Sequence, residues 1–134
     1  RDDELVVFAA PASPLALAVT LDDRALASQP WIVRERGSGT RQTFDRAMHG
    51  LLPDLDIAKE VQQTEANKRA VEAGLGVGCL SRISLVDAFR RGTLVPLEVP
   101  GRDFSRELFL ITHRKKFHGV ALQRWLELCG ESVD

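Results

Sequence analysis

The residues best suited to binding a ligand lie in one segment, Arg34–Arg41, with the sequence Arg-Glu-Arg-Gly-Ser-Gly-Thr-Arg. Its glycines let a ligand approach the backbone closely, and the hydroxyl groups of Ser38 and Thr40 can donate hydrogen bonds. A helix that begins here would favour a negative charge through its amide groups and dipole. Arg34 and Arg41 would add bidentate recognition of a carboxylate, sulfate or phosphate. The segment predicts an anion site, and the alternative is a serine-capped, glycine-rich turn with solvated arginines.

The sequence contains no complete motif for nucleotide binding, catalysis or metal coordination. The chain contains no GxxxxGK[ST] sequence, and Gly74–Gly78 lacks the third spacing of GxGxxG and precedes a strand instead of following one. Ser38 does not stand in a GxSxG nucleophile elbow. No carboxylate partner at triad or metal spacing is evident for the histidines, which are His49, His113 and His118. We therefore predict no catalytic residue, no metal site, no cofactor and no enzymatic activity.

Length and composition restrict the class of protein further. The chain has 134 residues, 44% of them hydrophobic, which favours a single domain with a core of its own. A formal net charge of −1 excludes a polyanion binder that works by bulk positive field. The longest apolar stretch, Leu5–Pro11, is far shorter than the roughly 20 residues that cross a bilayer. With no export signal visible, we predict a cytoplasmic protein without a membrane partner.

The two cysteines, Cys79 and Cys129, are fifty positions apart in apolar surroundings, and no CxxC motif is present. This spacing favours two reduced, buried thiols over a redox pair or a zinc site. A redox pair would require contact between the two residues in the folded chain.

Strand-like and helix-like segments alternate along the chain with short connections. The segments with a strand pattern are Leu5–Ala10, Trp31–Val33, Ile57–Val61, Val77–Leu80, Leu94–Val99 and Leu108–Thr112. In the third of these, Ile57 and Val61 are expected to share one face. The alternation is typical of an α/β domain built on a mostly parallel sheet flanked by helices.

One helix is expected before the strand at 57–61 and another after it. The first follows the glycine-rich turn and has apolar residues at i, i+3, i+4 and i+7, namely Phe44, Ala47, Met48 and Leu51. Thr64 is expected to cap the second helix. Glu65 would lie in its first turn, where negative charge is favoured, and Gly74 would end it.

Two further helices are expected in the second half of the chain. Ser84 and Asp87 form a capping signature before an apolar run, and Gly92 is expected to end that helix. The apolar face of residues 120–129 predicts a terminal helix.

Three strand ends are predicted to lie on one rim of the sheet. Open parallel sheets bind ligands beyond the carboxyl ends of their strands, where helices begin. The segments at those positions are Arg34–Arg41, Gln62–Thr64 and Ser81–Ser84, and each carries hydroxyl side chains. If the three strands are parallel neighbours, these segments lie side by side.

The ordered set of segments resembles the effector-binding domain of LysR-type transcriptional regulators. The resemblance covers essentially the whole chain and is carried by Leu5–Ala16, Arg34–Arg41, Asn67–Ser81, Gly92–Leu97 and Glu107–Leu128. It implies a fold like that of the type II periplasmic binding proteins, in which a small ligand binds between two α/β subdomains joined by two crossing strands. Residues 10–106 would form the second regulatory subdomain and one wall of the effector cleft. Residues 1–9 and 107–134 would supply the crossing strands and the C-terminal helix of the first.

Effector-binding positions follow from the resemblance and from charge. The resemblance places them at the starts of two helices, at Ser38, Gly39, Thr40, Thr64 and Glu65. Arg34 and Arg41 are added because their charge would favour an anion, and we therefore expect a small carboxylate or an oxyanion such as sulfate. The resemblance also implies that binding favours one angle between the subdomains and so changes how a tetramer presents its DNA-binding heads.

The resemblance also sets the expected partners. DNA would be contacted only through a helix-turn-helix preceding Arg1, which this sequence lacks. Uncovered apolar faces and sheet edges predict self-association as a homodimer or tetramer. Three alternatives stay open: a solute-binding protein of a transport system, an enzyme on the same scaffold, and an interaction module in which the arginine-rich segment is only a turn.

Overall fold

The computed structural model describes residues 2–18 and 21–107. Its strands are β1 (Asp2–Ala9), β2 (Pro30–Arg34), β3 (Asp56–Val61), β4 (Val77–Ser81), β5 (Val95–Leu97) and β6 (Ser105–Glu107). Its α-helices are α1 (Asp23–Ala27), α2 (Gly39–Ala47), α3 (Thr64–Glu72) and α4 (Arg82–Arg91), and short 3-10 turns lie at Pro14–Leu17 and Leu52–Asp54. The strand expected at 108–112, the helix expected at 120–129 and Cys129 lie outside the described residues.

The described strands form one sheet in the order β3-β2-β4-β1-β5, with β6 paired to β1. Strand β2 runs parallel to both β3 and β4, whereas β1 runs antiparallel to β4, β5 and β6. Among the described strands, β1 therefore runs in one direction and the other five run in the opposite one. The expected α/β class is confirmed, with the sheet mixed at β1 and parallel where the candidate site lies.

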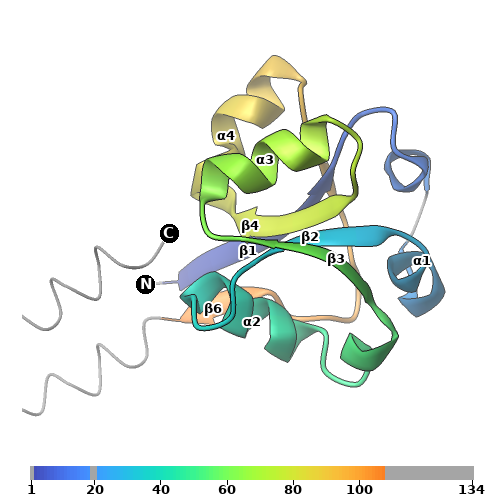
Figure 1. Cartoon of the computed structure of the whole chain (residues 1–134), viewed down its shortest axis with the longest axis vertical. Coiled ribbons are helices and arrows are strands. Elements are labelled where there is room, and N and C mark those ends of the chain that lie inside the picture. The colour runs from blue at the N-terminus through green and yellow to red at the C-terminus, as the bar shows by residue number, and fades with distance from the viewer. Residues whose placement is uncertain (1, 19–20, 108–134) are drawn as a thin grey trace, which may run out of the picture.

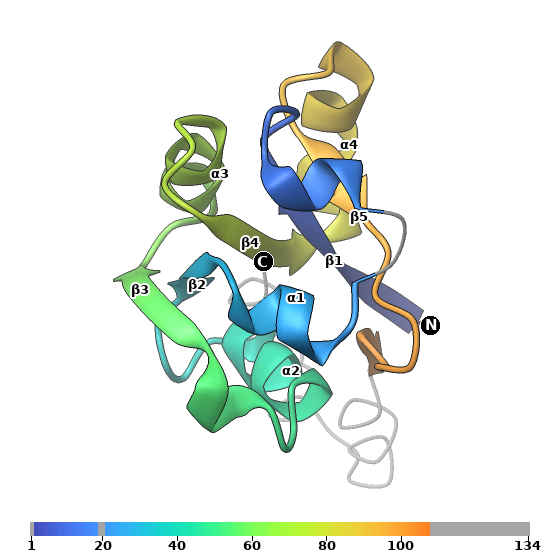
Figure 2. The same ribbon diagram turned by 90° about the vertical axis from the view of Figure 1, so that its right-hand side faces the viewer.

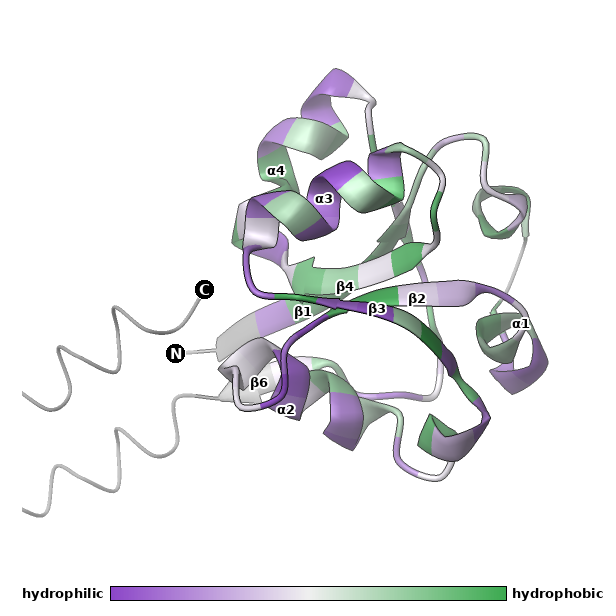
Figure 3. Cartoon of the chain, in the orientation of Figure 1, coloured by the Kyte–Doolittle hydropathy of each residue, from purple (hydrophilic) through white to green (hydrophobic). Residues whose placement is uncertain are grey.

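Helices cover both faces of this sheet (Figure 1, Figure 2). Helix α2 packs on one face, where Phe44 contacts Trp31 with ring centroids 5.2 Å apart. Helices α3 and α4 pack on the other, where their apolar residues meet Phe8 of β1. Because successive strand residues point to opposite faces, neighbours such as Val7 and Phe8 enter different cores. Figure 3 shows the hydrophobic residues concentrated in the central strands.

A bulge in the edge strand β3 changes which residues face each core. Trp31 pairs with Ile57, but the next residue, Ile32, pairs with Lys59, so β3 contains one extra residue at this point. Ile57 consequently packs against the α2 side, whereas Val61 lies in the core on the α3 side. The prediction that Ile57 and Val61 share a face is wrong, because the bulge shifts the alternation by one residue.

Helices α3 and α4 end at glycines, as predicted. Gly74 and Gly92 adopt left-handed backbone conformations with φ of 83° and 78°. Gly92 is the C-cap of α4, and Gly74 follows Ala73, the C-cap of α3. The predicted apolar face of α2 is buried, but the helix ends at Ala47, and Leu51 packs from the turn that follows.

The predicted starts of α3 and α4 are wrong. The N-cap of α3 is Gln63, and Thr64 is the first helical residue, with its hydroxyl occupied by Arg34. Helix α4 begins at Arg82, directly after β4, so Ser84 lies inside the first turn. Asp87 lies in the middle of that helix, where Arg90 and Arg91 hold its pKa below the ordinary value. No loop separates β4 from α4, so the expected segment consists of the last residue of β4, Ser81, and the first turn of α4.

Gly76 and Gly78, just before and within the start of β4, allow neighbouring segments to pack closely. A Cβ atom on Gly76 would lie 2.5 Å from the carbonyl oxygen of Pro30. On Gly78 it would lie 2.7 Å from Cζ of Phe8 and 2.8 Å from Oδ1 of Asn67. The buried Asn67 side chain donates from Nδ2 to the carbonyl of Ile32 at 3.2 Å, at the bulge. These contacts fix α3 against β2 and β4.

Candidate effector-binding site

The carboxyl ends of β2, β3 and β4 lie together at one rim of the sheet. The three strands are parallel neighbours, and α2, α3 and α4 begin where β2, β3 and β4 end (Figure 1). The sequence prediction of a shared rim is therefore confirmed. Three helix N-termini converge on it, and each brings a partial positive charge.

The start of α2 is fixed by a turn and a side-chain cap. Gly37 adopts a φ of 99°, a conformation that glycine reaches without strain. Ser38 is the N-cap, and its Oγ accepts a hydrogen bond from the backbone N–H of Arg41 at 3.0 Å. Gly39 and Thr40 form the first turn, with Thr40 only 1% exposed. The predicted helix start is present, and its serine caps the backbone.

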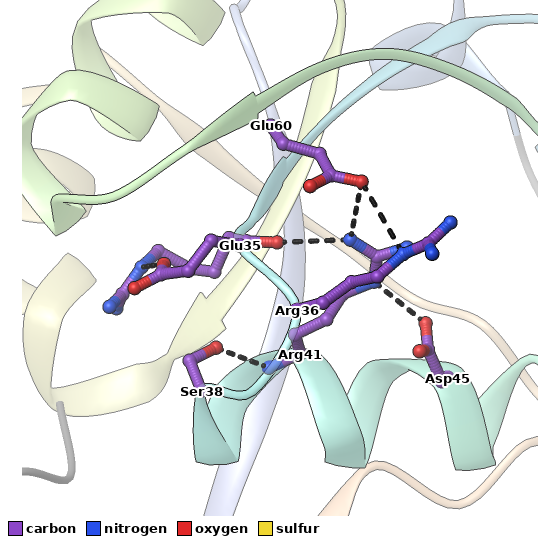
Figure 4. A network of polar contacts seen from close by, with 7 residues as sticks. Glu35, Arg36, Ser38, Arg41, Asp45 and Glu60 are labelled. Atoms are coloured by element: carbon purple, nitrogen blue, oxygen red, sulfur yellow. Dashed lines mark hydrogen bonds and ion pairs between the residues drawn. The ribbon is translucent and has the colours of Figure 1, made fainter.

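Arg41 lies in the first turn of α2, and its side chain joins three segments (Figure 4). The side chain is 5% exposed, and its Nε donates to Oδ1 of Asp45 at 2.8 Å. Its Nη1 donates to the carbonyl of Arg34 at 3.1 Å and lies 3.3 Å from Oε2 of Glu60. Arg36 also approaches Glu60, at 3.8 Å, but its side chain is 83% exposed.

The charges around Arg41 keep it ionised. Burial alone lowers the pKa of Arg41, but hydrogen bonds and charges from Asp45 and Glu60 outweigh burial and raise this pKa above its ordinary value. Asp45 could have been found from its i,i+4 spacing to Arg41. Glu60 gave no such signal, because only the pairing of β2 with β3 brings it within reach.

Arg34 and Thr64 meet at the rim although they are thirty positions apart. The Arg34 side chain is 8% exposed, and its Nη1 donates to Oγ1 of Thr64 at 3.3 Å. Its Nε donates to Oε1 of Glu35 at 3.0 Å. The structure therefore brings together a buried guanidinium, a hydroxyl and the start of α3. The Arg34 carbonyl joins this pair to Arg41.

Glu65 is oriented differently from the other predicted residues. It lies in the first turn of α3 as expected, but its carboxylate pairs with Nζ of Lys68 at 3.1 Å. The same ammonium donates to the carbonyl of Ser84 at 2.9 Å and so joins α3 to α4. These contacts place Glu65 in an inter-helix link beside the rim.

Other features of the described residues lie away from this rim. No group of three or more His, Cys, Asp or Glu residues in it could hold a metal ion. Within residues 2–18 and 21–107, no helix is long and apolar enough to span a membrane. A cavity of about 340 Å³ lies between β1 and residues 97–104, but none of the predicted effector residues lines it.

The chain matches relatives that are named as regulators. It is 49% identical over 129 residues to the uncharacterized HTH-type transcriptional regulator YeiE of Escherichia coli K12, which covers 96% of this chain and 43% of that protein. It is 30% identical over 126 residues to the HTH-type transcriptional activator CmpR of Synechocystis, covering 94% of this chain and 41% of that protein. The chain thus spans less than half the length of these relatives.

Solved structures of regulatory domains are also similar to this chain. The CcmR regulatory domain of Synechocystis, in complex with 2-PG, is similar with a TM-score of 0.67 and 28% identity over 96% of this chain and 62% of that one. The cofactor-binding domain of the Cbl regulator shares the fold, with a TM-score of 0.66 and 18% identity over 84% of this chain and 54% of that one. The family model of the LysR substrate binding domain matches residues 1–134. The chain therefore belongs to the LysR substrate-binding domain family, and its fold is the one that the sequence resemblance implied.

Proposed function

We propose that this domain senses a small anionic effector, a carboxylate or an oxyanion, at the rim formed by β2, β3 and β4. The observation that carries the proposal is the Arg34 guanidinium, which is almost fully buried beside the Thr64 hydroxyl and the start of α3. A buried guanidinium is a strong donor for an anion, and the helix N-termini favour the same sign of charge. The CcmR domain, 28% identical to this chain, was solved with 2-PG, which supports a small-molecule ligand.

The predicted site residues have two different roles in this proposal. Arg34, Ser38, Gly39, Thr40 and Thr64 would contact the effector. Arg41 would act indirectly, because its guanidinium is already engaged by two carboxylates and a carbonyl. Glu65 would belong to the site only through the start of α3, since its carboxylate faces Lys68.

The side-chain charges at the rim are balanced, which favours binding of a particular anion over attraction of any anion. The guanidiniums of Arg34 and Arg41 are matched by nearby carboxylates, so neither leaves an excess of side-chain charge. The attraction would therefore come from short hydrogen bonds and helix ends, which act only within a few ångströms.

In the whole regulator this domain would act as a switch. Residues 10–106 would be one wall of the cleft, and residues 1–9 with 107–134 would join it to the first subdomain. Effector binding would favour one inter-subdomain angle and so alter DNA binding through a separate helix-turn-helix, in the cytoplasm. Self-association as a dimer or tetramer would use exposed apolar side chains such as Ile83 and Val86, which are three positions apart on α4 and 78% and 53% exposed.

The relatives favour this role over the alternatives. YeiE and CmpR are named as transcriptional regulators, which supports a sensor over a transport receptor or an enzyme.

Sulfate titration of the full chain tests the proposal, at constant ionic strength maintained with sodium chloride and followed by calorimetry and amide NMR. We expect Arg34→Met to weaken sulfate binding about tenfold or more, and Arg34→Lys and Thr40→Ala by less, since each removes only part of the donor set. Arg36→Met is the matched control, because it removes the same charge from an 83% exposed side chain and should change affinity less than twofold. Unchanged affinity in both Arg34→Met and Thr40→Ala would contradict the site.

A further inference from the structure

A carboxylate of the protein itself already occupies one edge of the candidate anion site. Oε1 of Glu35 accepts a hydrogen bond from Nε of Arg34 at 3.0 Å. The Arg34 side chain is 8% exposed, whereas that of Glu35 is 35% exposed. The buried partner is thus the fixed donor, and the carboxylate reaches it from the solvent side.

The chain keeps this carboxylate close to Arg34 at all times. Glu35 directly follows Arg34, and its backbone N–H donates to the carbonyl of Val61 at 3.0 Å, which extends the pairing of β2 with β3. The backbone is therefore held, and the carboxylate can leave Arg34 only by rotating its side chain. It cannot diffuse away as a free anion would.

The edge that Glu35 uses is one that an incoming carboxylate would need. A guanidinium binds carboxylates side-on through pairs of parallel N–H groups, and the Nε–H belongs to one such pair. With Nη1 directed to Thr64, Glu35 stands where an effector would form its hydrogen bond to Nε. Glu35 therefore imitates the ligand class that the site is proposed to bind.

We propose that Glu35 is a specificity-determining residue that acts as a tethered competitor for Arg34. The inference rests on the anion site of the proposed function. An effector must displace the Glu35 carboxylate and tolerate its negative charge nearby, so an anion that makes a single hydrogen bond gains too little to bind. An anion that engages Arg34, the Thr64 hydroxyl and a helix start together replaces the pair. A partly exposed ion pair is weak enough for such an exchange.

Neutralising Glu35 tests the inference with inorganic sulfate as the probe. In the full chain, Glu35→Gln should bind sulfate about five- to tenfold more tightly than the wild type at low ionic strength, because one charge a few ångströms away no longer repels it. The gain should shrink as sodium chloride screens that repulsion. Glu72→Gln is the matched control, with the same charge change at an exposed position at the far end of α3, and should alter affinity less than twofold.

The outcomes separate this inference from the proposed function. Tighter, salt-sensitive binding in Glu35→Gln with no change in Glu72→Gln supports the competitor role. Equal or weaker binding in Glu35→Gln, while wild-type binding still depends on Arg34, overturns the competitor role and leaves the anion site standing. If neither the wild type nor Glu35→Gln binds sulfate, the anion site fails and this inference fails with it. Urea unfolding of each variant confirms that the comparison is between folded proteins.

Discussion

Arg41 and Arg36 allow a direct test of whether the candidate site is held in place by a buried guanidinium. Both arginines approach the same carboxylate, Glu60, but Arg41 is 5% exposed and Arg36 is 83% exposed. Replacing each by methionine removes one charge and keeps much of the apolar stem. We expect a large loss of stability for Arg41→Met and almost none for Arg36→Met.

The expected magnitude follows from the contacts of Arg41. Asp45 and Glu60 are each more than a third exposed, so each regains water and costs about 0.5–1 kcal/mol when its pair is lost. The buried Arg34 carbonyl loses its donor, which costs about 1–3 kcal/mol. We therefore expect Arg41→Met to lower the free energy of unfolding by about 3 kcal/mol. Arg41→Lys should lose about half of that, because an ammonium cannot reach all three acceptors.

Urea unfolding followed by circular dichroism measures this difference, and sulfate titration of the same variants measures the site. Arg41→Lys should fold but bind sulfate more weakly, because the loop that it positions is less well fixed. Arg36→Met should stay within about 0.5 kcal/mol of the wild type. Equal effects of Arg41→Met and Arg36→Met would refute the reasoning, since burial would then carry no energetic weight at this position.

Three further predictions concern the packing, the cap and the thiol. Gly78→Ala should destabilise the fold by about 1–3 kcal/mol in urea unfolding, and Phe8→Leu should relieve part of that loss in a double-mutant cycle, since the new Cβ would lie 2.7 Å from Cζ of the ring. Ser38→Ala should cost about 1 kcal/mol by removing the N-cap of α2; Ser38→Asp should retain the stability but weaken sulfate binding through its charge, and equal sulfate affinity would argue against a ligand role. Burial raises the pKa of the Cys79 thiol, so it stays neutral in the fold while the unfolded thiol ionises near pH 9. The free energy of unfolding should therefore fall above about pH 9, by up to about 1.4 kcal/mol per pH unit, and Cys79→Ala should remove that contribution in urea titrations at pH 8, 9 and 10.

The edge strand β3 shows why a sequence pattern can locate a strand without predicting which core each of its residues faces. The sequence correctly indicated a strand at 57–61, but five of the six residues of β3 are partly or fully exposed. The bulge opposite Ile32 then put Ile57 and Val61 into different cores. A bulge depends on how two strands pair, so it cannot be predicted from the sequence of the segment alone.

The starts of α3 and α4 were harder to predict than their ends for a related reason. Gly74 and Gly92 adopt left-handed conformations that other residues avoid, so the residue type itself marks the ends of α3 and α4. The starts depend on where the preceding strand finishes. Strand β4 leads directly into α4, which leaves the Ser84–Asp87 signature inside the helix.

The α/β class, the shared rim and a helix start in the segment Arg34–Arg41 could be predicted from the sequence, because periodicity, glycines and capping residues act over a few neighbouring positions. The partners of each guanidinium depend instead on how the sheet and helices pack. Arg34 and Arg41 stand in the same sequence segment and were predicted to have the same role. In the structure, Arg34 donates to Thr64, thirty positions away, whereas Arg41 is enclosed by Asp45 and Glu60. Sheet order sets these distances, and burial sets which pairs are strong, so neither follows from spacing along the chain.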